Sequence, residues 1–178
     1  NVNNALAALS VAKLYRISPQ ASAKAFGNLN LTENRAEWVS GTAGERILSD
    51  VYNSNPTAVK EVMAAFSKVA TIGKRRVVLG DMLELGEQSD GLHAGLATVF
   101  DPTLVQDVYL VGPHMKALYD ALQDKFEVAH LHLYATDEQA QLITQLNADI
   151  QPEDIVLIKG SHGIHLENVL AALQTNND

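Results

Sequence analysis

Apolar residues along this chain follow two patterns that alternate. Short continuous apolar runs occur at 77–80, 108–112 and 155–160, with a shorter one at 129–134. Such runs are typical of strands buried on both faces, as in a parallel sheet. Between them, apolar residues recur at i, i+3, i+4 and i+7, the spacing of a helix with one buried face. The alternation predicts an α/β fold: an open, mostly parallel sheet with helices on both faces. The helical stretches lie at 59–66, 92–100, 115–122, 142–150 and 166–173.

A segment of a different kind precedes this pattern. Residues 1–31 are Ala-rich and helical in pattern, with Ser18 and Pro19 suited to begin a helix and Gly27 suited to end it. Polar, turn-like residues follow and place a domain boundary near residue 31. Because the helical pattern starts at the first residues and no initiator Met is present, we expect a fragment of a longer protein. A β-hairpin comes next, with strands at 35–40 and 46–51 around a Gly-containing turn.

Composition narrows the class of protein. The 178 residues are 47% hydrophobic and contain no Cys, which excludes disulfide scaffolds, thiolate metal sites and cysteine nucleophiles. Asp and Glu number 21 against 13 Lys and Arg, and the net charge of −8 argues against a nucleic-acid-binding protein. No apolar run approaches the ~20 residues of a membrane span. Neither the dinucleotide-binding glycine motif nor the phosphate-binding loop is present, so a dinucleotide-dependent oxidoreductase is disfavoured.

Residues 50–57 join a predicted strand to a predicted helix and carry the first candidate site. Asn55 is suited to cap that helix and Pro56 to begin it, which explains both without any function. A carboxylate at the end of a strand, beside free helix-terminal N–H groups, could bind a diol and a phosphate. Capping leaves three residues unexplained: Asp50, Tyr52 and Asn53.

Residues 80–87 form the second candidate site, also after a strand. Asp81 and Glu84 could bind a cation or orient a catalytic loop. The alternative is that Glu84 and Glu87 merely favour a helix N-terminus. The residues alone leave both interpretations open.

The third candidate site is the end of the last apolar run. Lys159 closes a buried strand, where an unpaired ammonium group is unfavourable, so it should reach a carboxylate or an anionic ligand. His162 and His165 have a spacing that could ligate a metal, but they lack a third ligand and are more typical of surface residues. Among the other basic residues, 74–76 are interpreted as the solvated entry to a strand.

These three segments together resemble the C-terminal part of the Mur ligases of peptidoglycan synthesis. The family carries Asp-x-Tyr-Asn-x-Asn-Pro, Gly-Asp-Met-x-Glu-Leu-Gly and Lys-Gly-Ser stretches, which stand here, in the same order, at Asp50–Pro56, Gly80–Gly86 and Lys159–Ser161. Asn1–Ala8 also resembles the Asn-rich helix start that closes the family's central domain. The resemblance covers essentially the whole chain. It implies a Rossmann-like C-terminal domain over 32–178, preceded by a short helical segment, 1–31, from the central ATPase domain.

The resemblance also implies an activity. Members of this family are ATP-dependent amide ligases that form an acyl phosphate. The implied substrates here are UDP-N-acetylmuramoyl-tripeptide and D-alanyl-D-alanine, with ATP and Mg²⁺ held mainly by the central domain. The fragment alone is then expected to be inactive, and the protein to be cytoplasmic and monomeric, without nucleic acid or membrane insertion. Two alternatives remain: another Mur-type amide ligase, or a non-catalytic α/β binding module.

Residue roles follow from motif position within the family. The implied nucleotide-binding residues are Arg35 for the ATP phosphates, Asp50 for the ribose, and Tyr52, Asn53 and Asn55 for the loop facing the nucleotide. The implied substrate-binding residues are Lys159, Ser161 and His162, and the loop-ordering residues are Asp81, Glu84 and His93. No catalytic residue and no metal ligand is assigned. The chain departs from the family at Asn34, Ala58 and His162, where relatives often have Gly, Ser and Arg.

Overall fold

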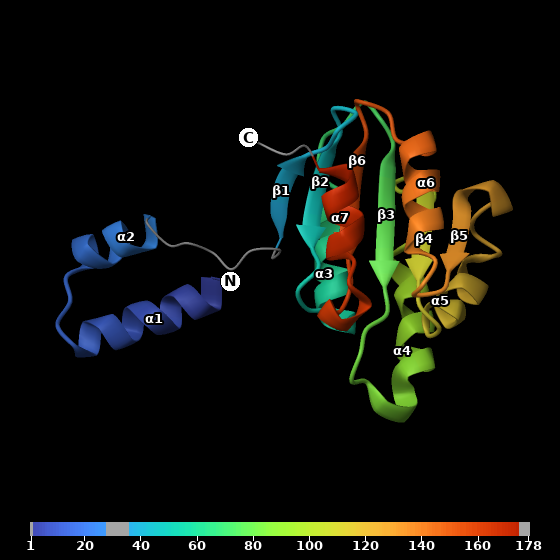
Figure 1. Cartoon of the computed structure of the whole chain (residues 1–178). Coiled ribbons are helices and arrows are strands. Elements are labelled where there is room, and N and C mark those ends of the chain that lie inside the picture. Colours follow the sequence, from blue (N-terminus) through green and yellow to red (C-terminus); the bar gives the residue numbers. More distant parts are fainter. Residues whose placement is uncertain (1, 28–35, 175–178) are drawn as a thin grey trace. The chain divides into compact units, whose positions relative to one another are not determined.

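The computed structural model describes residues 2–27 and 36–174, and it divides into two compact units (Figure 1). The division falls between Thr32 and Glu33. The boundary expected near residue 31 and the phosphate ligand expected at Arg35 both lie outside the described residues.

The N-terminal unit consists of two helices, α1 (Val2–Leu14) and α2 (Pro19–Gly27). The Ser18 hydroxyl accepts a hydrogen bond from the Ala21 amide at 3.1 Å, and Pro19 is the first helical residue. The predicted start of the second helix is therefore confirmed. Within the described residues, no helix of either unit is long and apolar enough to cross a bilayer.

The second unit is built on a six-stranded sheet in the order β1-β2-β6-β3-β4-β5. The first two strands form the predicted antiparallel hairpin, and every other neighbouring pair is parallel. This confirms the predicted open, mostly parallel sheet. The strands are β1 (Glu37–Ser40), β2 (Arg46–Asp50), β3 (Arg75–Gly80), β4 (Asp107–Val111), β5 (Leu131–Tyr134) and β6 (Ile155–Lys159).

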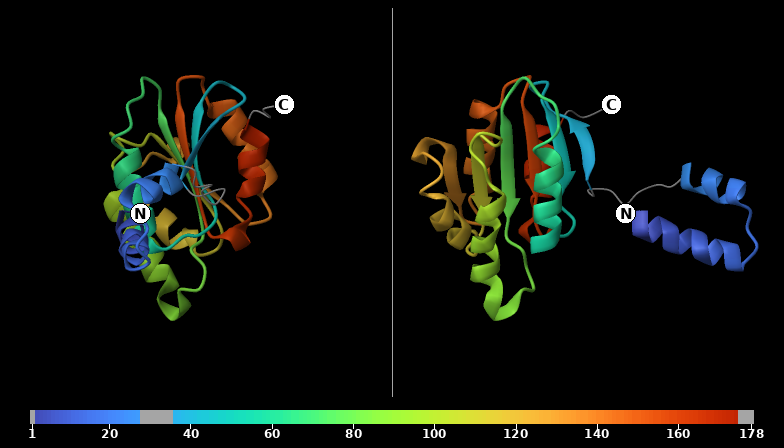
Figure 2. Two further views of the ribbon diagram at one scale, coloured as in Figure 1. Left: turned by 90° about the vertical axis from the view of Figure 1, so that its left-hand side faces the viewer. Right: turned by 180° about the vertical axis from the view of Figure 1, so that it is seen from behind.

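Helices cover both faces of this sheet (Figures 1 and 2). The face that includes Val77 and Leu79 packs on α3, α5 and the segment around Leu96, whereas Val78 points to the other face, under α6 and α7. Successive strand residues thus enter opposite cores, which is why their runs are apolar without alternation. The helices are α3 (Pro56–Phe66), α4 (Ser89–Ala94), α5 (Met115–Leu122), α6 (Gln139–Asp149) and α7 (Glu167–Leu173).

One predicted helix is divided in the structure. The apolar stretch at 92–100 is α4 followed by the 3₁₀ segment η2 (Gly95–Val99). Gly91 and Gly95 favour the irregularity, because glycine is among the poorest helix formers. The remaining 3₁₀ segments are η1 (Gly86–Gln88), η3 (Val128–His130) and η4 (His162–Ile164).

At the amino ends of the strands, the interpretation of residues 74–76 as a solvated strand entry is wrong for Arg76. Arg76 does not lie in solvent but is 3% exposed. Its guanidinium donates to the carboxylates of Asp154 at 2.8 Å and Asp107 at 2.7 Å, and to the Tyr109 hydroxyl at 3.2 Å. Buried carboxylates require such a partner. Burial and the hydrogen bond from its hydroxyl to Asp149 raise the pKa of Tyr109.

Candidate functional site

The sheet topology brings the three sequence motifs to one edge. Strand β6 comes last in the sequence but lies between β2 and β3, so the loops after these three strands are neighbours at their carboxyl ends, the lower edge of the sheet in Figure 1. The chain moves outward through β3, β4 and β5, then returns to the other side of β3 to form β6. Such a reversal opens a crevice where α/β proteins bind their ligands.

Lys159 and Asp50 form the centre of this edge. They are register partners at the ends of β6 and β2. The Lys159 ammonium donates to Asp50 Oδ2 at 2.6 Å and to the Asn53 carbonyl at 2.7 Å. The lysine side chain is 1% exposed and the aspartate side chain 18%. The expectation that Lys159 reaches a carboxylate is therefore confirmed, and its partner is the aspartate of the first motif.

The rest of the first motif leads into α3. Asn55 is the N-cap: its side-chain oxygen accepts from the Ala58 amide at 2.9 Å, and Pro56 follows as the first helical residue. Tyr52 lies on the surface, 46% exposed, with its ring 6.2 Å from that of His162 in a stacked arrangement. The first and third motifs are thus joined by the buried Lys159–Asp50 ion pair. On the surface, the ring of Tyr52 also stacks on that of His162, which directly follows the third motif.

The third motif is also bonded to the second. The Ser161 hydroxyl accepts from the Leu83 amide at 3.0 Å, and the Ser161 amide donates to the Asp81 carbonyl at 3.2 Å. Gly160 makes this approach possible, because a Cβ atom there would stand 2.9 Å from Leu166 Cδ1 and 3.3 Å from Gly80 Cα. Lys159 and Ser161 therefore tie the last strand to the loops on either side of it.

Asp81 is buried and faces the start of α5. Its two carboxylate oxygens accept from the Met115 amide at 2.8 Å and the His114 amide at 3.2 Å. A carboxylate in this position satisfies helix N–H groups and complements the helix dipole. Glu84 is exposed and has a left-handed backbone with φ of 63°. The two carboxylates of this motif are thus in different environments.

His93 connects the second motif to α4 through hydrogen bonds of its ring. Its ring is fully buried, with Nε2 accepting from the Met82 amide at 2.9 Å and Nδ1 lying 2.7 Å from the Ser89 carbonyl. These contacts are both satisfied by the neutral ring protonated at Nδ1. The imidazole therefore connects the start of the motif loop to α4.

The described residues contain no group of three or more His, Asp or Glu side chains close enough to hold a metal ion such as Mg²⁺. Both oxygens of Asp81 already accept backbone N–H bonds, and Glu84 points to solvent. The described part of the chain therefore does not fit a Mg²⁺ centre.

Sequence reasoning assigned no role to His114, which lies beside this site. Its Nδ1 is 2.7 Å from Asp90 Oδ1, and its ring lies over that of His93 at 5.6 Å. The hydrogen bond to Asp90 raises the pKa of His114. The sequence did contain one signal for His114: it follows Gly112 and Pro113, where a predicted strand leads into a predicted helix and ligand-binding loops are expected.

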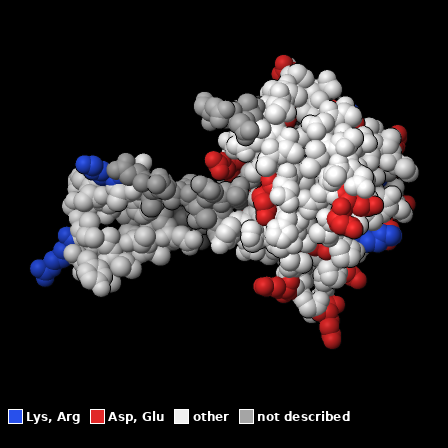
Figure 3. Space-filling model, viewed as in Figure 1, with Lys and Arg blue, Asp and Glu red and all other residues white. Residues whose placement is uncertain are grey.

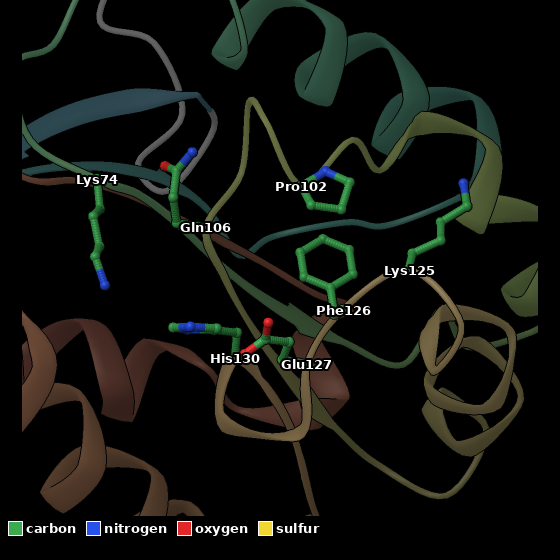
Figure 4. A pocket seen from close by; sticks show the side chains of 7 residues that line it. All are labelled: Lys74, Pro102, Gln106, Lys125, Phe126, Glu127 and His130. Carbon is green, nitrogen blue, oxygen red and sulfur yellow. The ribbon is translucent and has the colours of Figure 1, made fainter.

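A pocket of about 350 Å³ lies elsewhere, toward the amino ends of the strands (Figure 4). The rings of Phe126 and Pro102 line one part of it, and Lys74 and His130 another. Its lining contains none of the predicted site residues. Acidic side chains are scattered over the face of the α/β unit seen in Figure 3, in keeping with the net charge of −8. The carboxyl edge therefore remains the candidate site, on the convergence of its three motifs.

Comparison with known sequences gives a consistent result. Residues 34–162 match the family described as "Mur ligase, glutamate ligase domain". The UDP-N-acetylmuramoyl-tripeptide–D-alanyl-D-alanine ligase of Bacillus subtilis (strain 168) is 30% identical over 173 residues, which cover 97% of this chain and 37% of that protein. The protein of the same name from Escherichia coli (strain K12) is 29% identical over 179 residues, covering 99% and 37%. The chain spans little more than a third of the length of these relatives.

Comparison with solved structures agrees on the fold. A MurF crystal structure from Acinetobacter baumannii superposes with a TM-score of 0.75 at 25% identity, covering 96% of this chain and 36% of that one. MurF from Thermotoga maritima, solved in complex with ADP, gives a TM-score of 0.71 at 23% identity, covering 92% and 35%. The second likeness bears on the fold alone. Both support the Rossmann-like arrangement expected from the sequence.

Proposed function

The chain belongs to the Mur ligase family, and on that premise we propose that it is the C-terminal part of an ATP-dependent ligase that adds D-alanyl-D-alanine to UDP-N-acetylmuramoyl-tripeptide. The observation that carries the proposal is the convergence of the three motifs at the carboxyl edge of β2, β6 and β3. Relatives that match nearly the whole chain carry this enzyme's name. The use of ATP implies a cytoplasmic reaction.

The proposed chemistry has two steps. The terminal carboxylate of the tripeptide attacks the γ-phosphorus of ATP, giving an acyl phosphate and ADP. The amine of D-alanyl-D-alanine then attacks the acyl carbon, phosphate leaves, and the amine loses a proton as the amide forms. Such reactions depend mainly on positioning and on stabilising charge. Mg²⁺ and the phosphate-binding loop belong, in this proposal, to the remainder of the ligase.

This chain would contribute the ribose side of the nucleotide site. Asp50 retains 18% exposure and, as a carboxylate, can accept further hydrogen bonds besides the one from Lys159. The ribose hydroxyls are suitable donors. Asn55 would act indirectly, because its side chain is committed to capping α3. Tyr52 and Asn53 would complete the loop facing the nucleotide, and Arg35 would reach the phosphates.

The dipeptide side of the site would be formed by the third and second motifs. His162 is 69% exposed in its side chain and stands where relatives often carry Arg. Ser161 is 8% exposed and fixes the Leu83 amide, so its contribution would be the shape of the loop. Asp81 and His93 would hold that loop in place through the bonds described above, with Glu84 at its exposed tip.

The helical unit is proposed to be the end of the central ATPase domain. Its α1 exposes large apolar side chains, including Leu6 at 55% and Leu14 at 82%, and Tyr15 just beyond it is 77% exposed. Exposed apolar surface of this kind indicates packing against another part of the protein. Amide hydrogen exchange of residues 2–27 should be fast in the isolated chain and slow in the full-length protein; equal exchange in both would contradict this assignment.

The activity itself is tested in the full-length protein. Phosphate release from ATP should require both UDP-N-acetylmuramoyl-tripeptide and D-alanyl-D-alanine, and the product should contain the new amide bond. Single amino acids and other dipeptides serve as competing amines. Turnover with one of these instead would indicate another Mur-type ligase. A natural reading frame without a phosphate-binding loop, and without ATP turnover, would indicate a non-catalytic binding module.

A further inference from the structure

Lys159 is among the most deeply buried side chains of the described residues. Its side chain is 1% exposed, although it stands at the carboxyl edge where ligands are expected to bind. Two of its three ammonium protons are directed to acceptors of this chain, at 2.6 and 2.7 Å. At 1% exposure, the side chain leaves almost none of its surface accessible to a substrate.

Both acceptors belong to one short segment. Asp50 ends β2, and Asn53 lies three residues further on, just before the α3 cap at Asn55. A single ammonium therefore fixes the two ends of the turn that carries Asp50. Hydrogen bonds to charged groups are shorter and stronger than neutral ones, so this turn is held firmly.

The backbone of Lys159 is fixed by the two strands that flank β6 in the sheet. It is bonded in register between β2 and β3, where it pairs with Asp50 and Leu79. Two residues later, Ser161 is bonded to the loop that follows β3. The position of the ammonium is thus set by the centre of the sheet and not by an exposed loop.

We propose that Lys159 is a positioning residue for the nucleotide site: it orients the Asp50 carboxylate toward the ribose hydroxyls and does not contact the incoming dipeptide. The inference rests on the proposed function, because it takes Asp50 as the ribose ligand. It assigns Lys159 a different role from the substrate contact implied by motif position. The carboxylate oxygen held by Lys159 is Oδ2, and the exposed part of Asp50 is left for the nucleotide.

The test compares ATP with 2′,3′-dideoxy-ATP in the full-length ligase. Wild-type enzyme should show a KM for ATP about tenfold or more below that for the dideoxy nucleotide, the range expected of hydrogen bonds to a charged group. Lys159→Met should raise the KM for ATP to near that for the dideoxy nucleotide. The KM for D-alanyl-D-alanine should change by less than about twofold. A variant that was merely destabilised would raise both nucleotide KM values together and keep their ratio.

Two further variants complete the design. Lys116→Met removes an exposed ammonium paired with Asp120, whose side chains are 58% and 50% exposed, and should leave the nucleotide preference unchanged. Lys159→Gln keeps N–H donors on a shorter side chain and replaces the Met variant if that protein does not fold. Folding of each full-length variant is checked by far-UV circular dichroism and thermal melting.

Each outcome has a distinct meaning. Loss of the nucleotide preference in the Lys159 variant, with the dipeptide KM unchanged, is the expected result. A preserved preference with a raised dipeptide KM would refute the inference and leave the proposed function standing. A wild-type enzyme that does not distinguish the two nucleotides would refute the ribose role of Asp50 and the inference with it.

Discussion

Replacing Arg76 by Met should severely destabilise the α/β unit. The guanidinium is 3% exposed and bonds two carboxylates, Asp107 and Asp154, whose side chains are 5% and 2% exposed. Met fills a similar volume but leaves both carboxylates buried without their main cation. Removing one partner of a buried ion pair destabilises proteins by about 3–5 kcal/mol. Whole domains are stable by only about 5–15 kcal/mol, so the loss would be a large share of the total.

The measurement is urea unfolding followed by Trp38 fluorescence, together with thermal melting. Trp38 lies in β1 with its ring 6.4 Å from Phe66, so unfolding changes its environment. A loss of about 3–5 kcal/mol lowers Tm by roughly 10 °C in a domain of this size. The matched control, Lys116→Met, removes an exposed i,i+4 pair that should contribute only about 0.3–0.5 kcal/mol.

A compensating variant separates the cause from lost packing. Adding Asp107→Asn and Asp154→Asn to Arg76→Met removes the uncompensated charges and should recover part of the stability, because replacing an entire buried ionic group is far less harmful than breaking it. A change in the free energy of unfolding below about 1 kcal/mol for Arg76→Met alone would refute a stabilising role of the buried ion pairs. Unchanged stability after neutralising both aspartates would refute it as well.

Two smaller predictions concern the candidate site. Asp81→Asn leaves one oxygen acceptor for the two backbone amides at the start of α5, and should lower the free energy of unfolding by about 1–3 kcal/mol in urea; an unchanged midpoint would contradict this. The pKa of His114 is raised by its bond to Asp90, so that bond stabilises the fold fully below the unfolded pKa of about 6.5 and less as pH rises through the folded pKa. An NMR titration should show the raised pKa, and Asp90→Asn should return it toward 6.5; equal values in both proteins would be the contrary result.

Much of the fold was predictable because its signals are local. The buried runs around Val77 and Ile155 are apolar on both faces, and the Asn55–Pro56 pair marks the start of a helix. These properties depend on neighbouring residues alone. The hairpin at Gly41–Gly44 is of the same kind, because its turn residues adjoin the two strands they join.

The features that could not be predicted are contacts between residues far apart in sequence. Nothing near Lys159 indicates that β6 lies between β2 and β3, so its partner 109 residues away could not be identified. Arg76 was misinterpreted for the same reason, since Asp107 and Asp154 come from other strands and loops. The different environments of Asp81 and Glu84 likewise follow from where α5 begins.

We propose above that the carboxyl edge of this chain forms part of an ATP site. The most direct measurement is the affinity of the full-length protein for Mg-ATP, by calorimetric titration, with Asp50→Asn compared to the wild type and to Asp120→Asn as a surface control. Loss of a charged acceptor for the ribose should weaken binding about tenfold or more in Asp50→Asn and leave Asp120→Asn unchanged. Equal affinity in all three proteins would contradict the claim.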